Sequence, residues 1–325
     1  MKDESTSPDS PGRTGRGETM SNPNVLSLKV TIPALMQKKQ KRERITMLTA
    51  YDFPSAYLLD HSEVDIVLVG DSLNMVVLGH QDTLSIGMDE MIYHTRAVTR
   101  GCQRALVIGD MPYGSYQGGM NQAVQNGIRF MKEGGCAAVK LEGGKKRAGI
   151  IAALVEAEVP VMAHIGMTPQ SMHRFGGFKV QGKSIDTALA LMEDAIAVQE
   201  AGAFSVVLES IPAELASEIT PRLRIPTIGI GAGLDCDGQV LVWHDLLGLH
   251  EGRVAKFVKQ YANLYPQILQ AANAFCNDVH EGLFPDAQHH YSMPDAELFR
   301  EKVEERYGSY TTHPSDEGSF QKGKV

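Results

Sequence analysis

Four short apolar runs in the sequence each end in an acidic residue. None of them alternates polar and apolar residues, which is typical of strands buried on both faces in a parallel sheet. The carboxyl ends of parallel strands open onto one face, where α/β proteins place their active sites. Converging carboxylates repel one another unless a proton or a cation lies between them, so the pattern predicts a metal site. The acids are Asp71, Asp110, Glu142 and Glu209.

Asp71 and Asp110 each follow a glycine at the end of an apolar run. A glycine leaves room for a ligand close to the backbone. Magnesium takes one or two protein carboxylates with waters and substrate oxygens, although manganese, cobalt or zinc could replace it. Glu142, on the next strand, is predicted to be a third ligand or to hold a metal-bound water. A single Asp at such a junction is more often a helix N-cap, but the repetition across strands favours the metal.

Lys140 lies two residues before Glu142, so both side chains point the same way on a regular strand. In a barrel that direction is inward, where an ammonium needs an anion from the protein or from a substrate. A purely structural ion pair is the alternative. A Schiff-base role is disfavoured because neighbouring acids stabilise the charged ammonium over the nucleophilic amine.

Glu209 ends a later strand, across the predicted barrel from the metal acids. A carboxylate away from the metal stays free to act as a base, for example in removing a proton beside a carbonyl. His164 ends another strand and could donate a hydrogen bond to a substrate oxygen. A lone histidine there more often supports a neighbouring side chain, and its role stays open.

The elements that must position these residues are short strands alternating with helical patterns. Strands joined by helices pair in parallel with right-handed crossovers, and eight such units match the usual size of a (β/α)8 barrel, roughly 250 residues. A doubly wound open sheet is the alternative, but the first strand lacks the glycine-rich turn often found there. We predict strands at about 45–51, 65–70, 105–110, 137–142, 159–164, 204–209, 226–230 and 239–243, and helices at about 53–61, 88–100, 119–134, 145–157, 184–202, 213–219 and 254–275.

Two glycine-containing segments follow predicted strands. Residues 166–184 form a long loop with two aromatic and several basic residues, which is either a lid over the site or a surface excursion. Residues 228–233 read Ile-Gly-Ile-Gly-Ala-Gly, which resembles a phosphate-binding turn. We favour the simpler interpretation, in which these glycines allow a tight turn.

The composition restricts the class of function. The chain has 325 residues, 43% of them hydrophobic, and a net charge of −8. This balance argues against nucleic acid or an anionic membrane as the main partner, because both require a basic surface. Four scattered cysteines without a C-x-x-C pair fit free thiols and a cytoplasmic location. No apolar run approaches the length of a membrane span.

The two ends of the chain differ in composition from its centre. Residues 1–24 are rich in Ser, Pro, Gly and charge and lack the apolar stretch of a signal peptide, so we expect a disordered tail, with Met20 as an alternative start. Residues 25–292 are predicted to form the barrel. Residues 293–325 are a polar tail with one predicted helix at 295–307 and disorder beyond it.

Taken together, the segments resemble the ketopantoate hydroxymethyltransferase family, also called 3-methyl-2-oxobutanoate hydroxymethyltransferase. The matching stretches follow the family order over about residues 25–285, and as a set they are specific. Both tails lie outside the resemblance. The stretches are Thr49–Asp52, Val69–Leu73, Tyr93–Thr95, Gly109–Pro112, Val139–Gly144, His164–Ser171, Phe175–Gly182, Leu208–Glu209 and Ile228–Gly233.

The resemblance implies a (β/α)8 barrel of the phosphoenolpyruvate/pyruvate type, one magnesium ion per subunit and a homodecamer. It implies transfer of a hydroxymethyl group from 5,10-methylenetetrahydrofolate to 3-methyl-2-oxobutanoate, giving 2-dehydropantoate in pantothenate biosynthesis through a metal-held enolate. By resemblance, Glu209 is the catalytic base. The remaining matched positions are Asp71, Asp110 and Glu142 for the metal, and Asp71, Ser72, Asp110 and Lys140 for the 2-ketoacid.

Two other functions stay open on the sequence. One is a metal-dependent carbon–carbon lyase of the same barrel superfamily, which would act on a 2-oxo acid without folate. The other is a non-catalytic barrel, although the presence of every acid argues against it. No motif for the folate site is recognisable.

Overall fold

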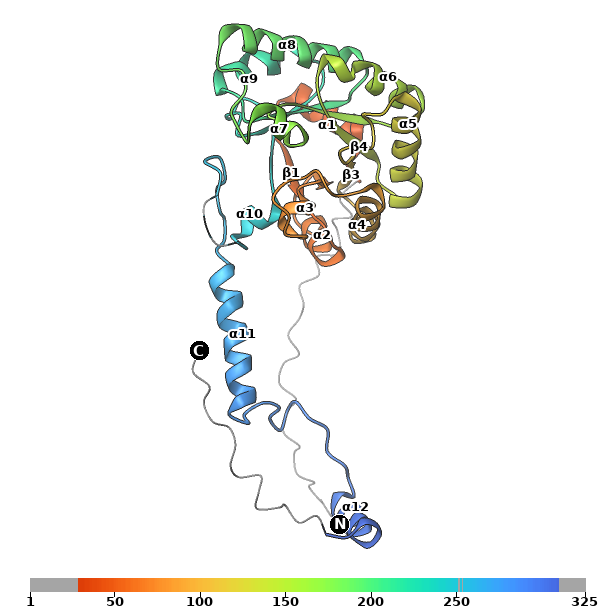
Figure 1. The fold of residues 1–325 in the computed structure, drawn as a ribbon, viewed down its shortest axis with the longest axis vertical. Helices are drawn as coiled ribbons and strands as arrows, with labels where there is room; N and C mark the ends of the chain where they lie inside the picture. Colours follow the sequence, from red (N-terminus) through yellow and green to blue (C-terminus); the bar gives the residue numbers. More distant parts are fainter. Residues whose placement is uncertain (1–28, 251, 253, 310–325) are drawn as a thin grey trace, which may run out of the picture. The chain divides into compact units, whose positions relative to one another are not determined.

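The strands form one closed parallel barrel, in which each strand pairs with the next and β8 pairs with β1 (Figure 1). The computed structural model describes residues 29–250, 252 and 254–309. The predicted (β/α)8 barrel is therefore confirmed and the open sheet is excluded. The strands are β1 (Ile45–Thr49), β2 (Ile66–Val69), β3 (Leu106–Asp110), β4 (Ala138–Glu142), β5 (Val161–Gly166), β6 (Ser205–Glu209), β7 (Thr227–Ile230) and β8 (Gly238–Leu241).

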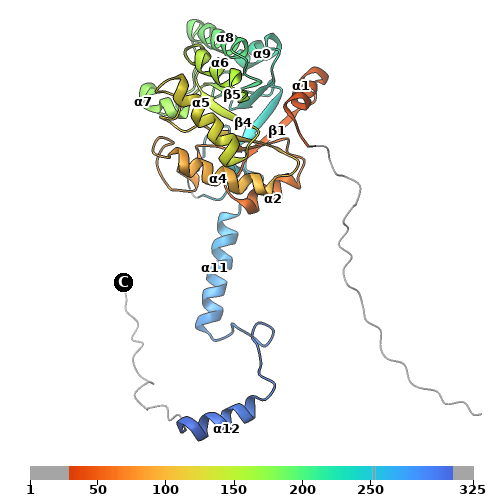
Figure 2. The same cartoon turned by 90° about the vertical axis from the view of Figure 1, so that its right-hand side faces the viewer.

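Helices connect the strands and cover the outside of the barrel. The helices are α2 (Phe53–Asp60), α3 (Leu73–Val76), α4 (Met88–Gly101), α5 (Met120–Arg129), α6 (Ala148–Glu156), α7 (Met172–Phe175), α8 (Ile185–Glu200), α9 (Ala213–Ile219) and α10 (Trp243–Leu247). Figure 2 shows α2, α4, α5, α6 and α8 following one another around the strands. The predicted helix 119–134 is α5 followed by a π-helical turn, Phe130–Gly134.

A helix that the sequence analysis did not predict, α1 (Ile32–Lys41), covers the amino-terminal end of the barrel. Thr31 is its N-cap, and its hydroxyl oxygen accepts a hydrogen bond from a backbone N–H in the first turn. Leu35 is buried in the cluster that fills the barrel interior. The Lys38 ammonium lies 2.6 Å from the carboxylate of Asp65, just before β2. The helix thus shields the interior from water on the side opposite the predicted site.

The inward-facing positions of the strands change from apolar to charged along the barrel axis. On β4, Ala138 belongs to the interior apolar cluster, and Lys140 and Glu142 follow at alternate positions. On β3, Ile108 belongs to the same cluster and Asp110 follows. Successive side chains of a strand alternate between its two faces. The charged residues at the carboxyl end therefore face inward for the same reason as the apolar residues two positions before them.

The glycine run after β7 makes a tight turn, as the sequence analysis favoured. Gly231 has φ +63° and Gly233 has φ +81°, a region that disfavours residues with a side chain. A Cβ atom on Gly231 would lie 2.8 Å from the ring of Phe257. Gly231 therefore lets the chain turn directly beneath an aromatic ring.

The described residues divide between Asn263 and Leu264 into two compact units. The second unit contains α11 (Tyr265–His280), so the prediction of a helix at 254–275 is wrong at both ends. Pro266 lies in the first turn of α11, where its fixed φ and missing N–H are tolerated. Proline thus sets the start of this helix later than the apolar pattern indicated.

The predicted helix at 295–307 is confirmed as α12 (Ala296–Tyr307). The predicted tail 1–24 and the stretch from residue 310 lie outside the described residues. The barrel bounds at 25–292 stay a prediction. Within the part of the chain that is described, no helix is long and apolar enough to cross a membrane.

Candidate active site

One cavity of about 140 Å³ opens at the carboxyl ends of the strands, inside the barrel. All seven residues that the sequence analysis selected line this cavity, although they come from five strands or the turns that follow them. They are Asp71, Ser72, Asp110, Lys140, Glu142, His164 and Glu209. The acids at the strand ends therefore lie around one small cavity, as the sequence analysis predicted.

A buried ion pair lies at the centre of the group. The Lys140 ammonium is 2.7 Å from Oδ2 of Asp110, and the two side chains are only 6% and 1% exposed. The backbone N–H of Asp71 donates to the same oxygen at 3.2 Å. Burial opposes the charged form of Lys140, but the surrounding acids together raise its pKa. Lys140 is therefore an ammonium at neutral pH and not a nucleophilic amine.

The two aspartates are not helix caps, which excludes the alternative considered from the sequence. Ser72 is the residue that precedes α3, and that helix has no side-chain cap hydrogen bond. By contrast, Asp52, after β1, is the N-cap of α2, and its Oδ1 accepts a hydrogen bond from the backbone N–H of Ser55 at 2.8 Å. The side chain of Asp71 instead accepts a hydrogen bond from the side-chain amide of Gln170, and that of Asp110 accepts one from the ammonium of Lys140.

Gln170 connects two of the acids to the protein frame. Its backbone N–H donates to Oε2 of Glu142 at 2.9 Å, and its side-chain amide donates to Oδ2 of Asp71 at 2.8 Å. Its amide oxygen accepts from the hydroxyl of Tyr116 at 2.6 Å. Gln170 lies in the 3₁₀ turn Pro169–Ser171 after β5. The turn therefore fixes how two carboxylates are oriented.

The sequence analysis did not identify Gln170, Tyr116 or Tyr51 as parts of the site. The hydroxyl groups of Tyr51 and Ser72 lie 2.8 Å apart in a hydrogen bond. Gln170 was quoted only within a stretch that resembles the family. Its residue type and position in a loop carry no signal of their own, so only the three-dimensional contact reveals its role.

Asp110 and Glu142 each have one carboxylate oxygen that is bonded to the protein and one that is not. Oδ2 of Asp110 and Oε2 of Glu142 accept the hydrogen bonds described above, whereas Oδ1 of Asp110 and Oε1 of Glu142 are buried without a hydrogen-bond partner. The hydroxyl of Thr83, which also lines the cavity, is buried and unpaired as well. Buried unpaired polar atoms are costly, so these atoms fit a bound polar ligand or cation.

The charge balance of the cavity also fits a cation. Burial and the neighbouring carboxylates of Asp110 and Glu142 raise the pKa of Asp71 well above its ordinary value. Burial likewise raises the pKa of Asp110, although the Lys140 ammonium opposes this. No group of three or more His, Cys, Asp and Glu side chains among the described residues is arranged to hold a metal by itself. Magnesium completed by waters and substrate oxygens suits such an incomplete protein ligand set.

His164 lies between the acid cluster and Glu209. Its Nδ1 is 3.5 Å from Oε1 of Glu142 and its Nε2 is 3.3 Å from Oε2 of Glu209, without hydrogen-bond geometry on either side. Burial and a nearby ammonium oppose protonation of His164, but the two carboxylates raise its pKa to about 9. The Glu209 side chain is 17% exposed, against 3% for Glu142. Among the four acids at the strand ends, Glu209 thus has the freest access to a ligand.

Comparison with known proteins identifies the family. The model of the ketopantoate hydroxymethyltransferase family matches residues 29–287. The chain belongs to the ketopantoate hydroxymethyltransferase family. The 3-methyl-2-oxobutanoate hydroxymethyltransferase of Pelobacter propionicus is 55% identical over 264 residues, which cover 81% of this chain and 98% of that protein. The protein of the same name from Syntrophomonas wolfei is 49% identical, covering 84% and 99%.

Solved structures with little sequence identity share the barrel. Phosphonopyruvate hydrolase in complex with oxalate and Mg²⁺ has a TM-score of 0.53 and 14% identity, covering 85% of this chain and 98% of that one. A 2,3-dimethylmalate lyase, described as a PEP mutase/isocitrate lyase superfamily member, has a TM-score of 0.51 and 16% identity, covering 85% and 99%. Similarity at this level is evidence of fold alone, and it confirms the predicted type of barrel for this ketopantoate hydroxymethyltransferase family member.

Replacing Gln170 with leucine should destabilise the protein, because Oδ2 of Asp71 and the hydroxyl of Tyr116 both lose a partner. We expect the free energy of unfolding in urea to fall by ~2–4 kcal/mol. Gln117→Leu is the matched control, since the side chain of Gln117 is bonded to the amide oxygen of Gln170, at 3.1 Å, and to two backbone N–H groups, but to no acid. Equal losses in the two variants would show that contact with the acids is not what matters.

Proposed function

We propose that this protein transfers a hydroxymethyl group from 5,10-methylenetetrahydrofolate to 3-methyl-2-oxobutanoate, giving 2-dehydropantoate in pantothenate biosynthesis. The family and the names of its relatives support the acceptor and the transferred group. The observation that carries the proposal is a division within one cavity. Asp71, Asp110 and Glu142 surround a single ammonium, whereas Glu209 lies apart from them beyond His164.

The acid cluster is the proposed metal side of the cavity. Asp71, Asp110 and Glu142 would hold magnesium, the last two through their buried unpaired oxygens, with manganese, cobalt or zinc as replacements. When bound, the metal would act as a Lewis acid on the oxo acid and make its C3 proton more acidic. The protein donors on the opposite oxygens keep the carboxylates oriented toward the cavity.

Lys140 and Ser72 are the proposed groups for the carboxylate end of the oxo acid. Among the described residues that line the central cavity, Lys140 is the only cation if His164 is left aside. The ammonium is bonded to Asp110 at 2.7 Å, and its remaining N–H groups would donate to the carboxylate of the oxo acid. The hydroxyl of Ser72 is oriented by its hydrogen bond to Tyr51. Together these groups would turn C3 of the substrate toward the free acid.

Glu209 is the proposed base. It would remove the proton from C3, directly or through a water, and the resulting carbanion would form the new bond to the methylene carbon of the folate. Overall, the two C–N bonds of the bridging methylene carbon are replaced by this C–C bond and by a C–O bond to water. The proton taken by Glu209 and one proton of the water go to the two folate nitrogens as tetrahydrofolate leaves. His164, 3.3 Å from Oε2 of Glu209, would keep that carboxylate pointed into the cavity.

We also propose a homo-oligomer in the cytoplasm, with a decamer as the size that the family resemblance implies. The helix α11 has no buried residue and exposes Ile268, Leu269 and Phe275. Exposed apolar side chains grouped on one helix favour a protein interface. The described cysteines are all free of disulfides, which fits a reducing compartment.

Glu209→Gln should abolish proton removal while leaving the oxo acid bound. The amide keeps the shape of the side chain but is not basic, so exchange of the C3 hydrogen for deuterium should slow about 10²–10⁴-fold. Proton NMR of 3-methyl-2-oxobutanoate in heavy water measures this without folate. Glu214→Gln, an exposed change on α9, is the control. Exchange at the wild-type rate in Glu209→Gln would exclude Glu209 as the base.

The folate requirement separates the proposed transferase from a carbon–carbon lyase of the same superfamily. We expect 2-dehydropantoate to form only when 3-methyl-2-oxobutanoate and 5,10-methylenetetrahydrofolate are both present, because the oxo acid supplies no one-carbon unit. Liquid chromatography with mass spectrometry detects the product. A protein that instead cleaves a branched 2-oxo acid without folate would be a lyase.

The variant Asp71→Asn, Asp110→Asn should bind magnesium ~100-fold or more weakly, because both substitutions remove charge from proposed ligands. Isothermal titration calorimetry measures the affinity in the absence of substrate. Asp52→Asn is the control, since it removes one charge at a neighbouring strand end and Asn keeps the helix cap. Unchanged magnesium affinity in the double variant would place the metal elsewhere.

A further inference from the structure

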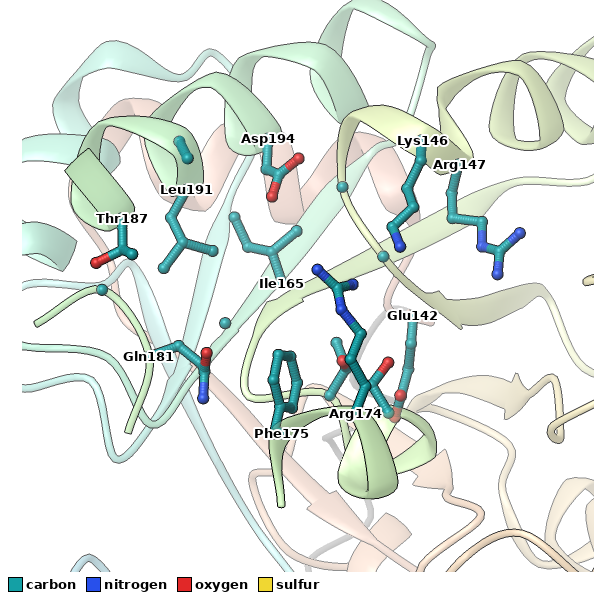
Figure 3. A pocket seen from close by; sticks show the side chains of 17 residues that line it. Glu142, Lys146, Arg147, Ile165, Arg174, Phe175, Gln181, Thr187, Leu191 and Asp194 are labelled. Carbon is teal, nitrogen blue, oxygen red and sulfur yellow. The ribbon is translucent and has the colours of Figure 1, made fainter. Parts of the chain in front are cut away.

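A second cavity, of about 250 Å³, lies beside the central one (Figure 3). Its walls come from the segments after β4 and β5 and from the helices α7 and α8. Glu142 lines both cavities, so this side chain forms part of the boundary between them. A ligand in the second cavity would therefore lie next to the reacting atoms without occupying the central space.

Two cations without a carboxylate partner face the second cavity. Figure 3 shows the ammonium of Lys146 and the guanidinium of Arg174 pointing toward the same space from opposite walls. Within the described residues neither forms a salt bridge, and the guanidinium of Arg174 has only a ring contact, 5.7 Å from the ring centroid of Phe175. Two converging, unpaired cations favour an anionic ligand.

The other groups of the cavity do not neutralise these cations by contact. Glu142 accepts the backbone N–H of Gln170, and Oδ1 of Asp194 accepts the backbone N–H of Lys145 at 2.7 Å. The guanidinium of Arg147 lies over the ring of Tyr116, 5.5 Å from its centroid. Phe175, Leu191 and Ile165 add apolar surface to the walls. The cavity therefore combines an anion-binding end with a wall that suits a flat organic group.

We propose that this cavity binds the glutamate end of the folate co-substrate, with its carboxylates at Lys146 and Arg174. The inference rests on the proposed function. A methylenetetrahydrofolate consists of a pterin, a benzoyl ring and a glutamate, so it cannot share about 140 Å³ with the oxo acid. Its methylene carbon must nevertheless reach the central cavity, which lies next to the second one because Glu142 lines both. The carboxylates of the tail supply the anions that the two cations lack.

The test replaces both cations by uncharged side chains of similar length, Lys146→Met with Arg174→Met. Two donors are compared, 5,10-methylenetetrahydrofolate and 5,10-methylenetetrahydropteroate, which lacks the glutamate. We expect the wild type to prefer the folate in kcat/KM by about tenfold or more, the worth of one charged hydrogen bond. In the double variant this preference should fall close to one, through a higher KM for the folate.

The control is Lys132→Met with Arg100→Met, which changes the net charge equally at exposed positions that do not line the cavity. It should keep the wild-type preference. Deuterium exchange at C3 without folate should stay within about twofold in all proteins, because it reports the central cavity alone. A double variant that retains the full preference for glutamate overturns the inference. A wild type that exchanges deuterium but makes no product from either donor overturns the proposed function instead.

Discussion

The structure depends on holding several carboxylates close together out of water. Asp71, Asp110 and Glu142 are each almost fully buried, and Lys140 is the ammonium among them. Taking a carboxylate out of water costs several kcal/mol unless it is paired. One ammonium cannot pair three acids, so the cluster either binds protons or binds a cation. In the protein without a ligand, burial and the repulsion between the acids raise the pKa values of Asp71 and Asp110.

The rest of the barrel holds these three carboxylates close together although they repel one another. The lower interior is filled with aliphatic side chains and covered by α1, so the strands cannot shift to separate the charges. Above it, Gln170 donates hydrogen bonds to one carboxylate oxygen of Asp71 and one of Glu142, and its own amide oxygen accepts a hydrogen bond from the hydroxyl of Tyr116. An acid whose second oxygen is held cannot rotate away from its neighbours. Orientation is thus fixed in advance of any ligand, which is what electrostatic preorganisation requires.

The sequence predicted what depends on strand period and topology, and it missed what depends on tertiary contact. Strand ends such as Asp71 and Asp110 converge in any parallel barrel, so their meeting followed from local pattern alone. Gln170 lies in a short turn, and its importance arises only because that turn folds over β3 and β4. The helix predicted at 254–275 was placed too early because the apolar pattern begins before Pro266, whereas the observed helix begins at Tyr265 with Pro266 in its first turn. The spacing of the acids predicted a cation, whereas the oxo acid and the folate could be predicted only from the family resemblance.

The position of Glu209 follows from the same charge problem. A base inside the acid cluster would have its lone pairs engaged by Lys140 or by a bound cation, and it could not accept a proton. A base far from the cluster could not reach a substrate held there. Glu209 is separated from Glu142 by one imidazole, which contacts both carboxylates and carries a raised pKa. His164 therefore lets a fourth acid approach the cavity without joining the cluster, and this spacing would allow one end of the barrel to hold both the proposed cation and the proposed base.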